Sequence, residues 1–515
     1  RKSFPQEQVV KSIFAAMESS AVAECLRDKC ILITGSTGYL GKLLLEKILR
    51  VQPAVKKLYL LVRAPDATSA EQRVLSEVIG KDPFNLLREK YGITGFQKFI
   101  KEKVVPLAGD IMDSHLGLDN ARVDALSEEI DVILNVAATT SFYERYDVAL
   151  ACNALGARNA CQFAKKCLNL KLFLHVSTAY VAGTQDGLLL EKALQSGETL
   201  REGLFLDVEA ELQLVENVRN ELTVVKKTNS SAPPEKSVMK KLGLERSCHF
   251  GWPNVYAFTK AIGETLIGQE RGDLPVVIVR PTMVTSTYKD PFPGWIEGAR
   301  TIDALIVAYN EQALPCFIGN RDEIIDVIPA DMVVNATLVA MVVHWNDKQQ
   351  VIYHVSSSLR NPLTVLVMED ACEDYFNDNP RVLENGKPLT NKRPYLFKGL
   401  ASFRVYMFLV YKVPLEMLHA VSMLFCGLFS KYYNKLNQRY NFLELLVKLY
   451  APYAFFKGRF DDTNFTKLRM ELKTDNGDDG IFNCDPNNIS WHKYFLYVHV
   501  PAVINDANVK KNRSE

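Results

Sequence analysis

The sequence predicts an α/β protein with a doubly wound parallel sheet, followed by a C-terminal domain that is mainly helical. Three observations support this fold class. Short apolar segments alternate with helix-like segments through the first half of the chain, and a glycine-rich turn follows the first strand-like segment. After about residue 365, aromatic-rich helix-like segments replace the alternation. Strands that alternate with helices in this way are typical of a parallel sheet covered by helices.

The predicted strands are short apolar runs. The first, residues 30–34, precedes a helical pattern over 41–50 and a second strand over 57–62. Strands of a parallel sheet read as nearly continuous apolar runs because helices cover both of their faces. Further strands are expected at residues 104–107, 132–136, 172–176 and 276–279.

The chain length indicates more than one domain, because 515 residues exceed what one hydrophobic core usually supports. We expect an N-terminal extension over 1–24, a sheet domain over 25–365 with a charged insertion at 184–250, and a helical domain over 366–515. Since the sequence starts at Arg1, a preceding stretch is also expected, and it leaves the targeting of the protein open.

Composition excludes several classes of function. The net charge of +1 gives no overall field that attracts nucleic acid, so no nucleic-acid partner is expected. The ten cysteines form no C-x-x-C pair, which indicates reduced thiols and no metal site. No uninterrupted apolar run reaches the ~20 residues that span a bilayer. The nearest approach, residues 405–429, is either a buried helix pair or an element for a membrane surface or hydrophobic substrate.

The glycine-rich turn has the pattern T-G-x-x-G-x-x-G between a strand and a helix. Such a Rossmann-like turn lets backbone approach a pyrophosphate, and the helix N-terminus offers free N–H groups to the phosphate charge. The turn therefore predicts a dinucleotide site, with its binding residues at Thr34, Gly35, Ser36, Thr37, Gly38, Tyr39, Leu40 and Gly41.

The end of the second strand favours NADPH over NADH. NAD-specific sites carry an acidic residue there, whereas this strand ends in Arg63, and Asp66 lies beyond Pro65. A guanidinium suits a 2′-phosphate because it is always charged and can bind two oxygens. Residues that follow later strands complete the predicted cofactor site: Asp110 and Ile111, then Ala137, Ala138 and Thr139, and finally Pro281.

Tyr256 and Lys260 form Y-x-x-x-K, one helical turn apart on the same face. A free tyrosine has a pKa near ~10, and a nearby ammonium is expected to lower the pKa toward the working range. The same lysine can hold the nicotinamide ribose. A hydroxyl at the end of strand 172–176 should complete the set, and both Ser177 and Thr178 stand there. The motif of extended short-chain dehydrogenases favours Thr178, whose hydroxyl would bind the substrate oxygen, while His175 reads as a strand residue.

Together these motifs resemble the plant-type fatty acyl-CoA reductase family, which includes the male-sterility proteins and is a branch of the extended short-chain dehydrogenases. The most specific stretch is G-W-P-N-V-Y-A-F-T-K at 251–260. At Gly41 many plant relatives are expected to carry alanine, and either small residue is expected to fit. The resemblance extends over residues 135–140, 144–150, 175–181, 286–289, 291–295, 326–333, 450–453, 458–464 and 482–491.

The resemblance implies an NADPH-dependent reduction of a long-chain acyl-CoA, or acyl-ACP, to a fatty alcohol through a retained aldehyde, for wax, cuticle or pollen-wall lipids. The helical C-terminal domain and residues 405–429 could then help to form an acyl tunnel. It also implies peripheral association with the endoplasmic reticulum membrane at its cytosolic face, or a plastid location. An aldehyde-releasing reductase, a sugar-nucleotide epimerase and a non-catalytic lipid-binding protein are the alternatives. The apolar C-terminal segment disfavours a sugar, and the catalytic set disfavours a non-catalytic role.

Overall fold

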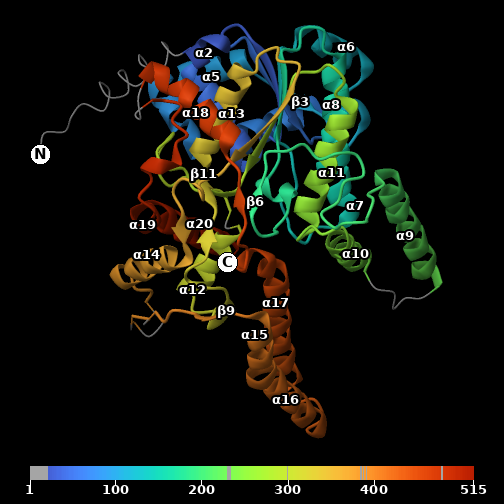
Figure 1. Ribbon diagram of the computed structural model, residues 1–515, viewed down its shortest axis with the longest axis vertical. Helices are drawn as coiled ribbons and strands as arrows, with labels where there is room; N and C mark the ends of the chain where they lie inside the picture. The colour runs from blue at the N-terminus through green and yellow to red at the C-terminus, as the bar shows by residue number, and fades with distance from the viewer. Residues whose placement is uncertain are drawn as a thin grey trace, which may run out of the picture.

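The computed structural model describes residues 21–514, apart from 229–233, 299, 383–385, 387, 390 and 477–479. Most of the predicted N-terminal extension therefore lies outside the described residues. The chain forms an upper α/β body and a lower helical part from which a long hairpin of helices extends (Figure 1).

The body is built on a seven-stranded parallel sheet, which confirms the predicted fold class. The strand order is β3-β2-β1-β4-β5-β7-β12, and the order reverses between β1 and β4. In a doubly wound sheet the crevice beyond the carboxyl ends of the strands at this point receives the ligand. The strands are β1 (Cys30–Thr34), β2 (Lys57–Val62), β3 (Val104–Ala108), β4 (Val132–Asn135), β5 (Leu172–Val176), β7 (Val276–Pro281) and β12 (Gln350–Val355).

Helices cover both faces of the sheet. Ile31 and Ile33 of β1 belong to one core, and Leu32 belongs to the other, because successive side chains of a strand point to opposite faces. The first face packs against α3 (Tyr39–Val51) and α13 (Ala330–Val343), and the second against α8 (Gly156–Lys166) and α11 (Val255–Glu270). The other body helices are α2 (Ala21–Cys25), α4 (Ala67–Arg73), α5 (Asn85–Lys103), α6 (Asn120–Glu129) and α7 (Tyr146–Ala149).

The predicted insertion holds a short strand, β6 (Leu188–Leu189), and two helices, α9 (Val208–Thr228) and α10 (Glu235–His249). The last part of the chain returns to the body, where α18 (Thr463–Asn476) packs against β12 and α13. Phe465 and Trp491 share one core with the sheet, so the division at residue 365 remains a prediction. The lower part also contains α12 (Ile302–Asn310), β9 (Cys316–Ile318), α14 (Val365–Asp378), β14 (Tyr395–Phe397), α19 (Trp491–Tyr494) and α20 (Val500–Ser514).

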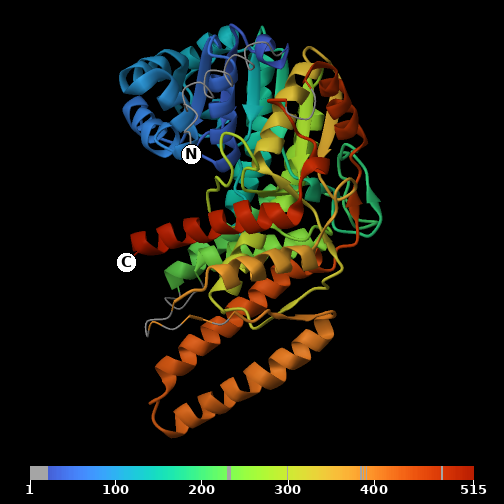
Figure 2. The ribbon, with the colours of Figure 1, turned by 90° about the vertical axis from the view of Figure 1, so that its left-hand side faces the viewer.

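The projecting hairpin consists of α15 (Leu400–Met407), a π-helical turn (Phe408–Lys412) and α16 (Val413–Leu424), which return through α17 (Ser430–Ala454). Figure 2 shows its two arms side by side, well away from the sheet. Over Leu400–Leu424, only 17% of the most apolar window is buried. The expectation of a buried helix pair at 405–429 is therefore wrong, because this hairpin has few neighbours to cover its apolar side chains.

A cluster of charged side chains, most of them buried, connects α3 to a neighbouring loop. Glu46 and Arg50 lie one turn apart and form an ion pair (Nε–Oε1 2.6 Å), and Arg50 also contacts Asp290 (2.6 Å). Lys47 forms a second ion pair with Asp290. Burial alone would raise the pKa of Asp290, but the charges of Arg50 and Lys47 lower it to about 2. This cluster ties the helix behind the glycine-rich turn to the loop that follows β8 (Met283–Thr285).

Asp290→Asn should destabilise the fold by about 3 kcal/mol, because it leaves Lys47 buried without its carboxylate partner. Since the pKa of Asp290 is lower in the folded chain, this contribution is present above pH ~4 and is lost as the pH falls toward about 2. Denaturant unfolding at neutral pH measures the loss. The matched control is Glu71→Gln, at an exposed position; equal stability of the two variants would contradict the prediction.

Candidate active site

The glycine-rich turn brings the ends of β1 and β4 together. Gly35 has a φ of +71°, and a Cβ there would lie 2.6 Å from the backbone nitrogen of Ala137. The Thr34 hydroxyl donates to Asn135 Oδ1 (2.7 Å) and accepts from the backbone N–H groups of Val136 (3.1 Å) and Ala137 (3.2 Å). Only glycine permits this close approach, which forms the floor of the crevice.

The other residues of the glycine-rich turn differ in their exposure and in the groups that they contact. A Cβ at Gly41 would lie 2.2 Å from the Gly35 carbonyl oxygen, so the expectation that alanine fits equally well is wrong. The Tyr39 hydroxyl points away from the turn and donates to the Trp295 carbonyl (2.9 Å). Gly38 is exposed at the N-cap of α3, and Ser36 Oγ is buried without a hydrogen-bond partner in the described part of the chain. Thr37 and Leu40 are half-buried.

The predicted groups beyond β2 and β3 lie at the same edge of the sheet. The Arg63 side chain is exposed and forms no ion pair with any residue that the structure describes. Asp110 Oδ1 accepts from the Met112 N–H (3.0 Å), and Ile111 is buried. Burial raises the pKa of the Cys152 thiol, and the charges that act on it are those of Lys260, Arg63 and Asp110. Lys260, Arg63 and Asp110 therefore all lie close enough to Cys152 for their charges to act on its thiol.

Asn153 fixes the backbone of the segment after β4 through two hydrogen bonds to Thr139. Its Oδ1 accepts from the Thr139 N–H (2.9 Å) and its Nδ2 donates to the Thr139 carbonyl (3.0 Å). Ala137 and Ala138 are half-buried, with small side chains that leave backbone accessible. Pro281, at the end of β7, accepts a long hydrogen bond from the Thr178 hydroxyl (3.5 Å). The close backbone approach at Gly35, which leaves no room for a Cβ, and the unpaired guanidinium of Arg63 together fit the phosphates of a dinucleotide.

Tyr256 stands in the first turn of α11, where Asn254 caps the helix by accepting from the Ala257 N–H (2.9 Å). Burial raises the pKa of Tyr256 to about 12, while Arg300 and a hydrogen bond with Thr178 act to lower it. Lys260 is not among the causes, so the expected lowering of this pKa by Lys260 is not what the structure shows. The loss of water around the phenol outweighs nearby charge, and Tyr256 stays an un-ionised donor.

Of the two hydroxyls that end β5, Thr178 is the one that contacts Tyr256. Ser177 Oγ is buried without a hydrogen-bond partner among the described residues. The position and partner of Thr178 match its predicted role, and the role itself remains a prediction.

Lys260 is buried below Tyr256. Its Nζ donates to the Val176 carbonyl (2.7 Å) and lies 3.0 Å from His175 Nε2. Burial lowers the pKa of Lys260 to about 8, against the opposing charge of Glu264. The contact between Lys260 and His175 could not be predicted from the sequence, because nothing in the spacing links a strand residue to a helix residue 85 positions later.

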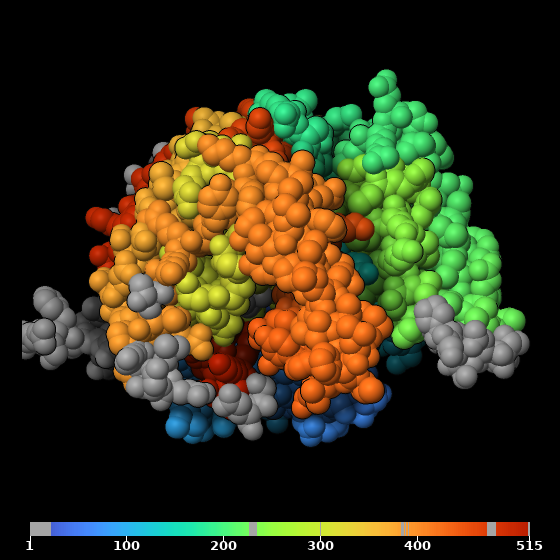
Figure 3. Space-filling view, turned by 90° about the horizontal axis from the view of Figure 1, so that it is seen from below, coloured from blue at the N-terminus to red at the C-terminus, as the bar shows by residue number. Residues whose placement is uncertain are grey.

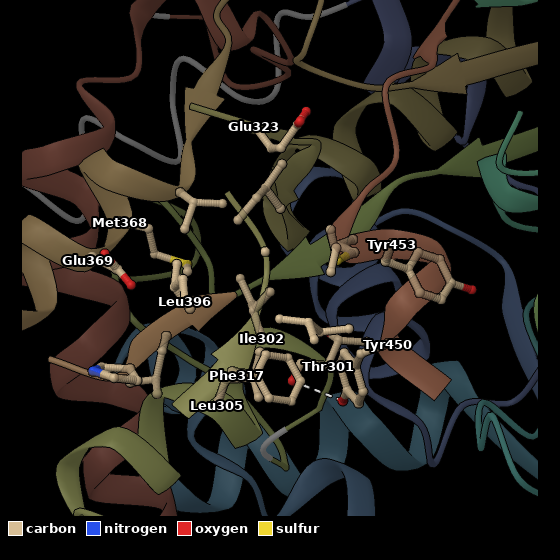
Figure 4. Close-up of a pocket in the computed structure, with 18 of the residues that line it drawn as sticks. Thr301, Ile302, Leu305, Phe317, Glu323, Met368, Glu369, Leu396, Tyr450 and Tyr453 are labelled. Carbon is tan, nitrogen blue, oxygen red and sulfur yellow. Dashed lines mark hydrogen bonds between the residues drawn. The ribbon is translucent and has the colours of Figure 1, made fainter. Parts of the chain in front are cut away.

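An apolar pocket, partly open to solvent, lies beside Tyr256. At one end it is lined by Phe142, Tyr180 and Tyr453, and the Phe142 ring stacks on Tyr256 with centroids 6.3 Å apart. Figure 4 shows Tyr450 and Tyr453 opposite Met368 and Glu369, with the hydrogen bond from Tyr450 to the Thr301 carbonyl (3.1 Å).

The pocket walls come from α12, β9, α14, β14 and the end of α17. None of residues 405–429 lines this pocket, in contrast to the expectation that they help to form a tunnel. Within the described residues, no group of three or more His, Cys, Asp or Glu side chains is arranged to hold a metal ion.

The chain is similar to known proteins over nearly its whole length. The profile of an NAD-binding family described as "Male sterility protein" matches residues 33–337, and a second profile with the same description matches 410–505. A crystal structure of the reductase (R) domain of a nonribosomal peptide synthetase from Mycobacterium tuberculosis superposes with a TM-score of 0.56 at 16% identity, over 98% of this chain and 99% of that one. That likeness shows the fold.

Two curated relatives match over nearly the whole chain. An alcohol-forming fatty acyl-CoA reductase from Simmondsia chinensis is 45% identical, over 95% of this chain and 99% of its own length. The chloroplastic fatty acyl-CoA reductase 2 of Arabidopsis thaliana is 37% identical, over 96% of this chain and 80% of its own length. The NAD-binding profile indicates a nicotinamide cofactor, and the chain belongs to the fatty acyl-CoA reductase family of male sterility proteins.

Proposed function

We propose that this chain reduces long-chain fatty acyl-CoA to primary fatty alcohols with NADPH. One observation carries the proposal: a pocket with an apolar lining lies beside Tyr256, because Phe142 both lines this pocket and stacks on the Tyr256 ring. An apolar pocket suits an acyl chain and disfavours a sugar, and it supports a catalytic rather than a scaffold role. The alcohol product would serve wax, cuticle or pollen-wall lipids.

The cofactor would supply one hydride from each of two successive NADPH molecules, the first to the thioester carbonyl and the second, after NADP+ has been exchanged, to the resulting aldehyde. The hydroxyls of Thr178 and Tyr256 would bind the carbonyl oxygen as negative charge develops on it. The hemithioacetal would then lose coenzyme A as its thiol. In the second reduction Tyr256 would give its proton to the alkoxide, a task that suits a phenol whose pKa lies at about 12.

The pocket offers a reason for the aldehyde to remain between the two reductions. Each methylene buried in it stabilises the complex by about 0.8 kcal/mol, so a long acyl chain keeps the reactive carbonyl beside Tyr256 after coenzyme A leaves. An enzyme that releases the aldehyde, or one that uses acyl-ACP as donor, would share the same catalytic set. Product and donor analysis separates these alternatives.

NADPH is the proposed form of the cofactor because of Arg63. Its guanidinium is exposed at the end of β2 and has no carboxylate partner among the described residues, so it can pair with a 2′-phosphate. The Arg63 carbonyl accepts from Arg73 (2.6 Å), and this contact holds the backbone of the turn.

The projecting hairpin is proposed to insert into the surface of a lipid bilayer. Phe408, Leu409, Met417 and Leu424 are each more than half exposed. Figure 3 shows the surface of this hairpin standing forward when the molecule is seen from below. Residues 398–448 hold seven basic and two acidic side chains, although the whole chain has a net charge of only +1. Apolar and basic groups together favour an anionic leaflet.

The cytosolic face of the endoplasmic reticulum is the proposed membrane, with a plastid as the alternative. Leu400–Leu424 has a mean hydropathy of 1.3 over its most apolar window and is long enough to cross a bilayer. Its place in a hairpin whose ends both return to one body supports surface insertion.

Tyr256→Phe should lower the rate of alcohol formation by about 10²- to 10⁴-fold, because the alkoxide loses its proton donor. Incubation with NADPH and a series of long-chain acyl-CoAs, followed by identification of alcohol and aldehyde, measures this loss and tests the function itself. Two NADPH should be consumed for each alcohol. The control is Tyr497→Phe, at an exposed tyrosine. Unchanged turnover in Tyr256→Phe would remove Tyr256 from the mechanism.

Arg63→Ala should raise the KM for NADPH by about ten- to a hundredfold, because one charge-assisted contact is lost, and should leave the KM for NADH nearly unchanged. Steady-state kinetics with each cofactor checks this difference, and Arg122→Ala, at an exposed arginine of α6, serves as control. An equal effect on both cofactors would show that Arg63 does not recognise the 2′-phosphate.

The double variant Leu424→Glu, Phe425→Glu should no longer float with vesicles of phosphatidylcholine and anionic lipid, because two charges at the hairpin tip oppose insertion. Its oxidation of NADPH with a soluble acyl-CoA should persist, since neither side chain lines the pocket. The control is Leu168→Glu, which changes an equally exposed leucine on the body. Flotation of the double variant at the level of the unaltered chain would refute the membrane role of the hairpin.

A further inference from the structure

A row of buried polar side chains crosses three neighbouring strands beneath the cofactor crevice. Thr34 of β1 is the register partner of Asn135 of β4, and Asn135 is the partner of His175 of β5. Thr34 Oγ1 lies 2.7 Å from Asn135 Oδ1, Asn135 Nδ2 lies 2.9 Å from His175 Nδ1, and His175 Nε2 lies 3.0 Å from Lys260 Nζ. All four side chains are almost fully buried.

The donors and acceptors of this row can be assigned from one end. Thr34 Oγ1 already accepts from the backbone N–H groups of Val136 and Ala137, so its own proton goes to Asn135 Oδ1. The Asn135 amide nitrogen then faces His175, and an amide nitrogen only donates. His175 Nδ1 must accept.

A neutral imidazole has one proton, so His175 then carries it on Nε2, where it points at Lys260. His175 is held neutral, since burial and the charge of Lys260 lower its pKa well below the ordinary value. An N–H that faces an ammonium finds no lone pair, whereas a neutral amine accepts it. The row therefore favours the uncharged form of Lys260.

We propose that His175 is a positioning residue that controls the protonation of Lys260, by presenting its Nε2–H under the constraint of Asn135 and Thr34. The ammonium forms fully when the Asn135 amide turns over and the imidazole shifts its proton to Nδ1. The role of Lys260 at the nicotinamide ribose rests on the proposed function; the hydrogen-bond row does not.

The other groups that face Lys260 are few. Glu264, on the same helix, favours the ammonium but is itself paired with Arg280 of β7 (Nε–Oε1 3.0 Å). Cys152, from the helical segment opposite, also favours the charged form. His175 is the contact that β5 supplies besides the Val176 carbonyl. The pKa of Lys260 is lowered to about 8, so its charge changes within a range that kinetics can reach.

The test measures how NADPH affinity depends on pH, by nicotinamide fluorescence with the full chain and no acyl substrate. In the unaltered chain affinity should fall as the pH rises through about 8, where Lys260 loses its proton. Thr34→Val frees Asn135 to turn, and His175→Gln can offer Lys260 a carbonyl oxygen. Each should move the midpoint upward by about one pH unit, the value of one hydrogen bond. Thr34→Ser, which keeps the hydroxyl, should retain the original midpoint.

A midpoint in Thr34→Val that is unchanged or lower would overturn the proposal, because it would mean that His175 already accepts from an ammonium. Thermal unfolding shows whether Thr34→Val and His175→Gln are folded. If one of them is not, the midpoint of the other tests the proposal. The result does not depend on alcohol formation. Failure to make alcohol with a normal midpoint shift would refute the proposed function alone, and alcohol formation without the shift would refute this inference alone.

Discussion

The close approach of the β1 turn to the backbone after β4 is the constraint on which the site depends. Gly35 and Ala137 come so near that no side chain fits at Gly35, and the Thr34 hydroxyl holds the two strand ends together. The strand order reverses at this point, which is where a doubly wound sheet receives its ligand. The Asn135–His175–Lys260 row then connects the same strand ends to α11, the helix that also carries Tyr256.

Much of this arrangement could be predicted from residue patterns. Apolar runs and the glycine spacing predicted the positions of six of the seven sheet strands along the chain, because those features follow from local burial and backbone sterics; β12 was not predicted. The link from Asn135 to His175 could not be predicted in the same way, because it depends on the register of two strands. A signal was nonetheless present: polar residues stand near the ends of three neighbouring strands, at Thr34, Asn135 and His175.

Two other features depended on tertiary environment. The spacing of Tyr256 and Lys260 predicted a lowered pKa for Tyr256, but burial raises this pKa instead. The burial of a single side chain cannot be predicted from such a sequence pattern. The apolar run at 405–429 was compatible with both a buried and a surface helix, and the buried helix pair was the preferred interpretation. Which of the two it forms depends on whether other elements reach it, and on this hairpin none covers Leu424.

The shared core of the sheet and the C-terminal helices has a consequence for engineering. Leu305 of α12 and Met368 of α14 face Tyr450 of α17 across the pocket, so segments far apart in the chain form its walls together. Phe465 and Trp491 then anchor the end of the chain in the core of the sheet. The pocket therefore cannot be exchanged as a separate domain. Replacing the last third of the chain would change one wall of the pocket and would also disturb the core on which the other walls pack. Altered chain-length selectivity is better sought through paired substitutions on facing walls than through exchange of a domain.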